Sequence, residues 1–416
     1  MELRPKTVRE KIEELPTKSY CAYAWSGAAI GPTGDVFPCC RWQGPHTQGD
    51  PNVPNIKDGL VAAREGKYFS RIREQMINGE YPSGCAKCWR IEKKRLEEED
   101  AGIPSPQDSV PRVQIGHRIK VTSTKPQTEK IRYLETGVSN LCNMACVMCG
   151  PLASSTIFSI KNPGVKVPKG FHQDNTNIDD DLSELRYLKF VGGEPMLEKK
   201  HDDLLEMVIN QNADPSQLEM EYHTNASVFP SERVIACWKK IKLVRIIFSL
   251  DGVGDKVKLQ RPGKYVWQDL EDTVDKYVAI TNEVNIEFSS NTVLTSLNIG
   301  QGIDTVKWLY KKVGKCTLGW FNVNPEVMPK VSSKYLNHRN LSKETKERIK
   351  KEIADFKQSE HPALKTPIAK ILDIILHHID EHGDLDEDLT RELILEKHTN
   401  KDRWKHFGEE LKNLDI

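Results

Sequence analysis

The chain has 416 residues, and its 60 lysines and arginines balance 60 aspartates and glutamates, so its formal charge at pH 7 is zero. This balance disfavours a nucleic-acid-binding protein, and 38% hydrophobic residues exclude a chain that is disordered throughout. The charged N-terminus is unlike a signal peptide, and no run approaches the ~18 apolar residues of a membrane helix. These features predict a cytoplasmic protein of two or three domains without membrane association.

The first 100 residues are predicted to form a small α+β unit. Residues 28–40 contain Pro32 and Gly34, which favour a turn between two short strands. Apolar residues at helical spacing over 69–76 predict a helix, and the charged run 90–100 predicts a solvated one. Residues 101–127 are rich in Pro, Ser, Thr and Gln and are expected to be a linker.

A different pattern begins near residue 128, where strand-like segments alternate with helix-sized ones. The six strand-like segments are 131–135, 185–191, 218–222, 244–250, 284–288 and 317–321. This alternation predicts a parallel α/β sheet that curls toward an open or closed barrel, with ligands at the carboxyl ends of the strands. We expect this domain to span residues 128–335.

Residues 336–416 are predicted to be a helical extension. Ser342 and Thr366-Pro367 are suitable helix starts, and a third helix is expected from about Asp386. His377, His378 and His382 lie close together but lack a cysteine or a clear carboxylate partner. They are interpreted as exposed residues near a helix end.

Eight of the ten cysteines fall into two clusters before residue 150. A secreted disulfide framework would be expected in a short, loop-rich chain, so metal ligation is the better interpretation. The two remaining cysteines, Cys237 and Cys316, are interpreted as small buried hydrophobic residues.

The most specific motif is the C-x3-C-x2-C triplet of Cys142, Cys146 and Cys149, in a loop after the first strand of the barrel. Three thiolates can hold three irons of a 4Fe-4S cube and leave the fourth iron open to a substrate. The alternatives are a zinc site or three unrelated thiols.

Three further motifs follow successive strands in order. They are Gly192-Gly193-Glu194-Pro195, Thr224-Asn225-Ala226 and Ser249-Leu250-Asp251-Gly252, with Arg261 beyond them. Two glycines let the backbone approach a ligand, and the Glu194 carboxylate can pair with an ammonium group. Jointly, the triplet and these motifs resemble the radical S-adenosylmethionine superfamily over residues 128–330.

The resemblance implies a partial (βα)6 TIM-like barrel that holds a 4Fe-4S cluster and S-adenosylmethionine. The implied cofactor-binding residues are Met148, Gly192, Gly193, Glu194, Asn225, Ser249, Asp251 and Arg261. Met148 stands where many members carry an aromatic residue, and Ala226 stands where glycine is usual. The resemblance further implies reductive cleavage of S-adenosylmethionine to a 5′-deoxyadenosyl radical, with electrons from a reductant such as a flavodoxin or ferredoxin.

The N-terminal cysteines resemble the auxiliary-cluster domains called SPASM and twitch. Gly34 to Cys39 matches a G-x4-C element, and Cys85 and Cys88 match the closing pair. The resemblance implies a second 4Fe-4S cluster whose predicted ligands are Cys21, Cys39, Cys85 and Cys88. Cys40 is an alternative to Cys39, and a zinc ribbon is an alternative to the cluster. Such domains usually follow the barrel, whereas this one precedes it.

The expected substrate is a peptide or protein side chain, by resemblance to the SPASM/twitch group. The alternatives are a small molecule (a sugar, a nucleoside or an amino acid) and a non-catalytic iron-sulfur or zinc protein. No catalytic residue is assigned, although polar residues at or beyond strand ends are candidates to face the substrate: His223, Asn291, Asn298 and Asn322.

Overall fold

The computed structural model describes most of the chain between residues 7 and 379. The described residues are 7–31, 33–42, 52–101, 112, 125, 127–165, 177–295, 298–319, 322–324, 341 and 343–379. The third C-terminal helix predicted from Asp386 and most of the predicted linker lie outside these ranges.

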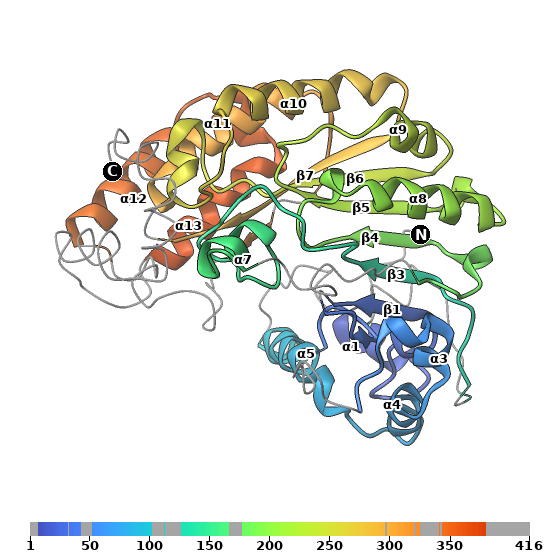
Figure 1. Cartoon of the computed structure of the whole chain (residues 1–416). Helices are drawn as coiled ribbons and strands as arrows, with labels where there is room; N and C mark the ends of the chain where they lie inside the picture. The colour runs from blue at the N-terminus through green and yellow to red at the C-terminus, as the bar shows by residue number, and fades with distance from the viewer. Residues whose placement is uncertain are drawn as a thin grey trace.

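One nine-stranded sheet organises the molecule (Figure 1). Its order is β2-β1-β3-β4-β5-β6-β7-β8, and β9 also pairs with β7. The strands are β1 Gly27–Ile30, β2 Val36–Phe37, β3 Tyr133–Thr136, β4 Tyr187–Phe190, β5 Glu219–Thr224, β6 Leu243–Phe248, β7 Ile286–Val293, β8 Thr317–Leu318 and β9 Asn322–Asn324. The β1–β2 hairpin is antiparallel, and the other pairs are parallel. The predicted parallel α/β fold is confirmed.

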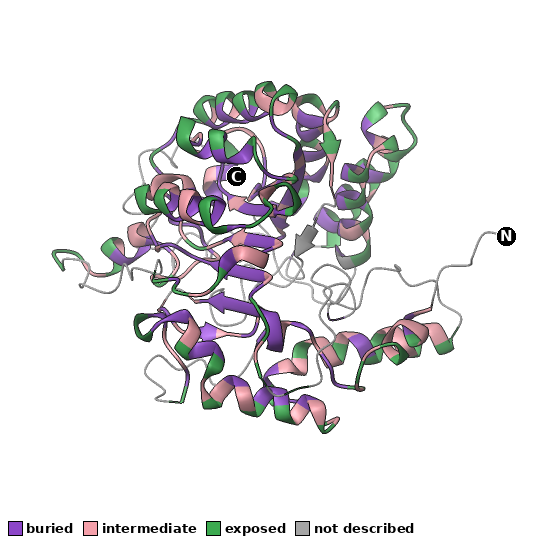
Figure 2. Cartoon of the chain, turned by 90° about the vertical axis from the view of Figure 1, so that its right-hand side faces the viewer, coloured by how far each residue is buried: buried purple, intermediate pink, exposed green. Residues whose placement is uncertain are grey.

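Helices follow most of the parallel strands and cover one face of the sheet. Those of the central region are α7 Ser155–Lys161, α8 Lys199–Gln211, α9 Glu232–Trp238, α10 Trp267–Ala279 and α11 Gly302–Val313. Their inner sides pack on alternate strand residues such as Leu188, Met220 and Phe288, which are fully buried. Figure 2 shows the result: strands are mostly buried, and the helices around them are exposed on their outer sides. This alternation leaves the other face of the sheet to polar side chains.

The N-terminal segment contributes both helices and sheet. Its helices are α1 Val8–Glu13, α2 Tyr23–Ser26, α3 Leu60–Glu65, α4 Lys67–Ile77 and α5 Ala86–Asp100. The predicted hairpin and the two predicted helices are therefore present. The sequence did not indicate that β1 would pair in parallel with β3, which adds the N-terminal hairpin to the edge of the main sheet.

Two described helices belong to the C-terminal region. Helices α12 Lys343–Lys357 and α13 Lys370–Ile379 carry the predicted apolar stripes, and Ile349, Ile353 and Ile375 are buried in the main core. None of the helices in the described ranges has the length and apolar character needed to cross a bilayer.

Candidate functional site

The loop of the cysteine triplet lies beyond the carboxyl end of β3 and is held by main-chain hydrogen bonds. Ala145 N donates to Pro262 O at 2.7 Å, and Val147 N donates to Gln260 O at 2.9 Å. Met144 forms an antiparallel bridge with Gly263. Residues 144–147 therefore lie against the segment that follows β6, which fixes the loop at the end of the sheet where parallel sheets bind ligands.

The start of α7 holds the other side of this loop. Cys142 N donates to Ser155 Oγ at 3.1 Å, and Thr156 Oγ1 donates to Cys142 O at 2.6 Å. Ser154 caps the helix and also donates to Met144 O at 2.7 Å. The backbone of the triplet is thus fixed on both sides.

The three predicted thiol ligands lie among polar partners. Asn225 Nδ2 is 3.9 Å from Cys142 Sγ, and Arg261 Nη1 is 3.6 Å from Cys146 Sγ. Burial raises the pKa of Cys142 to about 12, and a hydrogen bond with Cys149 together with burial raises the pKa of Cys146 well above its usual value. Buried thiols of this kind ionise when a bound metal supplies positive charge, as cluster ligands do.

The glycine turn after β4 packs against the same loop. Gly192 and Gly193 have positive φ angles of 77° and 51°, which favour glycine. A Cβ atom on Gly193 would overlap the carbonyl oxygen of Leu141, and Glu194 N donates to that oxygen at 2.7 Å. The two predicted motifs are therefore in direct contact.

Glu194 is buried between the ends of β4 and β5. Its carboxylate accepts hydrogen bonds from Thr224 Oγ1 at 2.9 Å, from Asn225 N at 2.7 Å and from Met196 N at 3.3 Å. Burial nevertheless raises its pKa to about 7. A cation placed beside this carboxylate would favour its ionised form, which fits a role in binding an ammonium group.

Asp251 and Arg261 form an ion pair at the cluster loop, with Arg261 Nε 2.6 Å from Asp251 Oδ2. Asp251 Oδ1 accepts a hydrogen bond from Val293 N at 2.7 Å, which ties β7 to the site. Arg261 also contacts Cys146, so its positive charge lies beside a predicted metal ligand. Asp251, which the resemblance implies to be a cofactor-binding residue, thus lies beside the cysteine loop, and apart from the ion pair its Oδ2 atom has no hydrogen-bond partner among the described residues.

The remaining predicted cofactor residues lie at the same edge. Ser249 follows β6 and is half-buried, with its N–H donating to Thr224 O at 2.8 Å. Met148 is half-buried against the main core. Ala226 has a φ of 59°, a conformation that explains why glycine is usual at this position.

Asn143 and Asn298 support the site in ways that sequence reasoning missed. Asn143 Oδ1 accepts a hydrogen bond from Asn225 Nδ2 at 3.0 Å. The C-x3-C-x2-C spacing could not indicate this role, because it places no requirement on the residues between the cysteines. Asn298, a candidate to face the substrate, instead donates to Asp251 O and Val293 O, both at 2.8 Å. His223 binds Glu221 at 3.1 Å, and the side chain of Asn322 lies outside the description.

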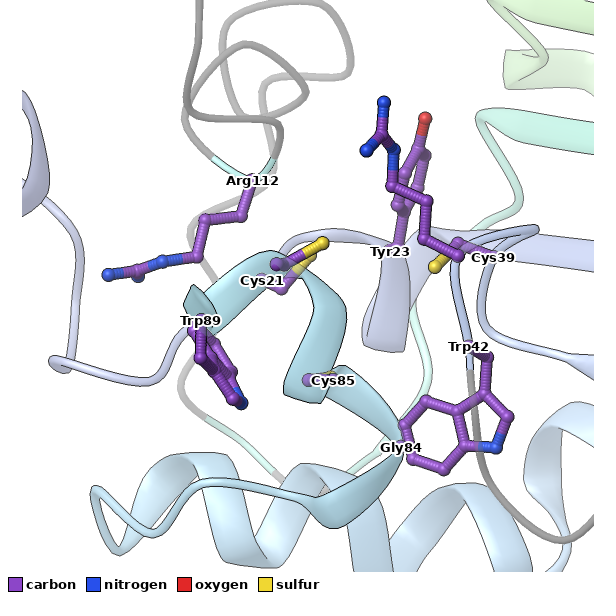
Figure 3. Close-up of a pocket in the computed structure, with 10 residues that line it drawn as sticks. Cys21, Tyr23, Cys39, Trp42, Gly84, Cys85, Trp89 and Arg112 are labelled. Carbon is purple, nitrogen blue, oxygen red and sulfur yellow. The ribbon is translucent and has the colours of Figure 1, made fainter. Parts of the chain in front are cut away.

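A second site lies in the N-terminal segment, where four cysteines line one pocket that opens to solvent (Figure 3). Cys21 precedes α2, Cys39 follows β2, and Cys85 and Cys88 lie at the start of α5. Cys40 does not line this pocket, because its thiol is directed to Glu135. The geometry therefore favours Cys39 over Cys40 as a ligand.

Bulky side chains enclose this pocket. Trp42 and Trp89 flank it, and Gly84 leaves room for the Trp42 ring, which a Cβ atom would overlap. Arg112 comes from the predicted linker, which gave no signal for such a role. Its guanidinium forms a bidentate pair with Glu92 at 2.5 and 2.7 Å and lies 5.1 Å from the centre of the Trp89 ring.

A zinc ion and a 4Fe-4S cluster place different demands on four cysteine ligands. Zinc in structural sites draws four ligands to about 2.3 Å from one point. Among the described residues, no three cysteine, histidine, aspartate or glutamate side chains converge closely enough to hold one metal ion. The four cysteines that line one pocket match the number of thiolates that a 4Fe-4S cube requires.

Comparisons with known proteins identify two domains. The model of the radical SAM superfamily matches residues 137–309, and the SPASM model, described as an iron-sulfur cluster-binding domain, matches residues 21–89. The search of curated proteins found no match. The N-terminal position of the second domain agrees with the expectation from the cysteine spacing.

Three solved structures illustrate what the chain resembles. Native anSMEcpe with bound AdoMet is 18% identical with a TM-score of 0.36, covering 53% of this chain and 58% of that one. SuiB from Streptococcus suis is 16% identical with a TM-score of 0.34, covering 70% and 63%. TsrM from Kitasatospora setae, a radical S-adenosylmethionine methyltransferase with cobalamin and a 4Fe-4S cluster bound, is 16% identical with a TM-score of 0.31, covering 45% and 36%. The chain spans less than two thirds of each of these proteins.

Proposed function

This chain belongs to the radical S-adenosylmethionine superfamily, and we propose that it cleaves S-adenosylmethionine reductively and removes a hydrogen atom from an organic substrate. One observation supports this most strongly. The cysteine loop, the turn that contains Gly193 and Glu194, and Asn225 follow three separate strands and contact one another at a single edge of the sheet. A 4Fe-4S cluster held by Cys142, Cys146 and Cys149 would supply the one electron that reductive cleavage of S-adenosylmethionine requires.

The residues of the chain bind and orient the reactants. Cys142, Cys146 and Cys149 would ligate three irons of the cluster and leave one for the amino and carboxylate groups of S-adenosylmethionine. Glu194, placed beside the glycine turn, would bind the ammonium group. Arg261 lies beside Cys146 and would offset part of the negative charge of the thiolates.

We assign the auxiliary 4Fe-4S cluster to Cys21, Cys39, Cys85 and Cys88. The pocket that these four residues line supports this ligand set. Four thiolates would complete the coordination of the cube, so this cluster would have no iron open to S-adenosylmethionine. An electron-transfer protein such as a flavodoxin or ferredoxin would supply the electron, and reduced cysteine ligands suit the cytoplasm.

The proposed substrate is a peptide or protein side chain. The match to the SPASM domain supports it, because the resemblance to that group implies such substrates. A sugar, nucleoside or free amino acid is the alternative. A purely electron-carrying protein is disfavoured, because it would not need a buried carboxylate and a glycine turn beside an incompletely ligated cluster.

The direct test is anaerobic reconstitution with iron and sulfide, followed by addition of S-adenosylmethionine and a strong reductant. Wild type should release 5′-deoxyadenosine and hold about eight irons per chain, as two cubes require. The triple variant Cys142→Ala, Cys146→Ala, Cys149→Ala should release none and keep about four irons.

Cys237→Ala is the matched control, because Cys237 is buried on α9 away from both cysteine sites. It should keep both the irons and the activity. Release of no 5′-deoxyadenosine by fully reconstituted wild type would contradict the proposed function, as would zinc in place of iron.

A further inference from the structure

An arginine from the predicted linker reaches the wall of the cysteine pocket. Arg112 lies outside the SPASM match, which ends at residue 89, yet its side chain lines the pocket of the four predicted cysteine ligands (Figure 3). Among the described residues that line this pocket, the other cation is Arg41, which is exposed. The Arg112 side chain is only 1% exposed. Its positive charge is therefore little screened by solvent.

Arg112 joins the two segments that carry three of the predicted ligands. Its Nη1 donates to Tyr20 O at 3.0 Å, and Tyr20 directly precedes Cys21. Its Nε and Nη2 donate to the two carboxylate oxygens of Glu92 at 2.5 and 2.7 Å. Glu92 lies one helical turn after Cys88 on α5, so both side chains project from the same face of the helix. One guanidinium thus connects the chain before Cys21 with the helix that carries Cys88.

The contacts of Arg112 require the planar shape of a guanidinium. Two of its N–H groups bind the Glu92 carboxylate, and a third is left for the Tyr20 carbonyl. The same group lies 5.1 Å from the centre of the Trp89 ring, and Trp89 follows Cys88 directly. The ammonium group of a lysine is a point charge on a flexible stem and could not make all of these contacts. The positive charge is thus held in one place at the wall of the pocket.

The charge of Arg112 acts on the thiols of this pocket. Burial raises the pKa of Cys21 to about 12, and Arg112 acts in the opposite direction. Burial also raises the pKa of Cys85 and of Cys88, and Arg112 again opposes it. The Glu92 carboxylate adds to the effect of burial at Cys21 and Cys88. A cluster bound by these thiolates would therefore experience both charges of the pair.

We propose that Arg112 is a positioning residue of the auxiliary cluster: it holds the segments of Cys21 and Cys88 together and favours the reduced form of the cluster. This inference rests on the proposed function, in particular on the assignment of the auxiliary cluster to the four cysteines. On reduction, the cluster takes one electron from the reductant, and no covalent bond changes. A buried cation stabilises the added negative charge, and Glu92 has the opposite effect.

The test is an EPR-monitored redox titration of the reconstituted full chain. The signal that survives in the triple variant Cys142→Ala, Cys146→Ala, Cys149→Ala identifies the auxiliary cluster in the spectrum of the holoenzyme. A buried unit charge about 10 Å from a cluster changes the equilibrium constant for its reduction about tenfold. Arg112→Gln should therefore lower the midpoint potential and make reduction about tenfold less favourable. Glu92→Gln removes a negative charge and should raise the potential.

Two further variants separate the charge of Arg112 from its hydrogen bonds. Arg112→Lys keeps the charge, so its potential should stay closer to that of wild type than the potential of Arg112→Gln does. It should lose iron to a chelator at least about tenfold faster than wild type, because the two ligand-bearing segments are no longer joined. Lys93→Gln is the matched control, since it removes one positive charge from α5 at a side chain that is 80% exposed. It should change neither the potential nor the release of iron.

The inference is overturned if Arg112→Gln and Glu92→Gln leave the potential unchanged or shift it in the same direction. Iron release from Arg112→Lys at the wild-type rate also overturns it, as does a shift in Lys93→Gln as large as that in Arg112→Gln. Glu92→Gln is nearly isosteric and tests the direction of the shift even if an Arg112 variant does not fold.

The outcome for the proposed function is measured separately. A triple variant without any cluster signal would overturn the assignment of the auxiliary cluster and this inference with it. Release of 5′-deoxyadenosine by the wild-type preparation tests the proposed radical chemistry, and it does not depend on the potential of the auxiliary cluster.

Discussion

At the residue scale, the main feature of the candidate site is the buried carboxylate of Glu194. Its hydrogen bonds favour the ionised form, but burial has the larger effect and raises its pKa to about 7. The sequence identified this residue by its place in a short motif. Its protonation could not be predicted, because burial depends on how β4 and β5 pack.

Glu194 should make the stability of the ligand-free protein fall as pH rises. Between pH 4.5 and about 7 the folded state binds a proton that the unfolded state has lost, so this contribution is complete below pH 4.5 and is lost by about pH 7. The expected loss is about 3 kcal/mol. Urea unfolding of wild type and Glu194→Gln across this range measures it. Equal pH dependence in the two proteins would contradict the raised pKa.

At the scale of elements, the turns after strands decide how the motifs meet. Gly193 follows β4 and touches Leu141 in the cysteine loop, so two positive φ angles and one tight contact bring separate elements together. The sequence revealed the glycines and the strand that precedes them. It did not reveal that the cysteine loop would also be bound by residues 260–263, since that contact joins segments more than 100 residues apart.

Gly193→Ala should destabilise the protein more than Gly164→Ala. Both glycines have positive φ angles, 51° and 80°, so both substitutions incur about 1–2 kcal/mol of backbone strain. At Gly193 the added methyl group meets backbone, whereas at Gly164 none of the described residues lies within 4 Å of it. Denaturant unfolding should show that Gly193→Ala lowers the free energy of unfolding more than Gly164→Ala does, by at least about 1 kcal/mol. Equal losses would mean that the turn does not pack tightly on the cysteine loop.

At the scale of the whole molecule, the N-terminal unit is attached to the barrel by more than the linker. β1 extends the main sheet, and Arg64 on α3 reaches across the contact to Asp180. The same guanidinium donates to Trp25 O at 2.9 Å and to Glu129 O at 2.6 Å. The predicted boundaries at residues 100 and 127 stay predictions, since most of that segment is outside the description.

Arg64→Ala should cost about 3–5 kcal/mol of stability, because it leaves Asp180 without its buried partner and removes one donor from the carbonyl groups of Trp25 and Glu129. Arg233→Ala is the matched control, since Arg233 pairs with Glu206 and Asp203 but is half exposed, and its loss should cost much less stability than the loss of Arg64. Urea unfolding compares the two variants. A similar, small effect of both would show that Arg64 does not hold the N-terminal unit to the barrel.

The sequence by itself determined the strand-helix alternation, the two cysteine clusters and the order of the motifs, because these follow from local spacing and from residue types with few alternative uses. Only the tertiary structure decided that Cys39 and not Cys40 lines the N-terminal pocket, that Asp251 pairs with Arg261, and that Arg112 joins Tyr20 to Glu92 beside that pocket. Those outcomes depend on strand register and on contacts between distant segments. A shift of one residue in a strand reverses the direction of every side chain, and no local pattern records which register the packed sheet adopts.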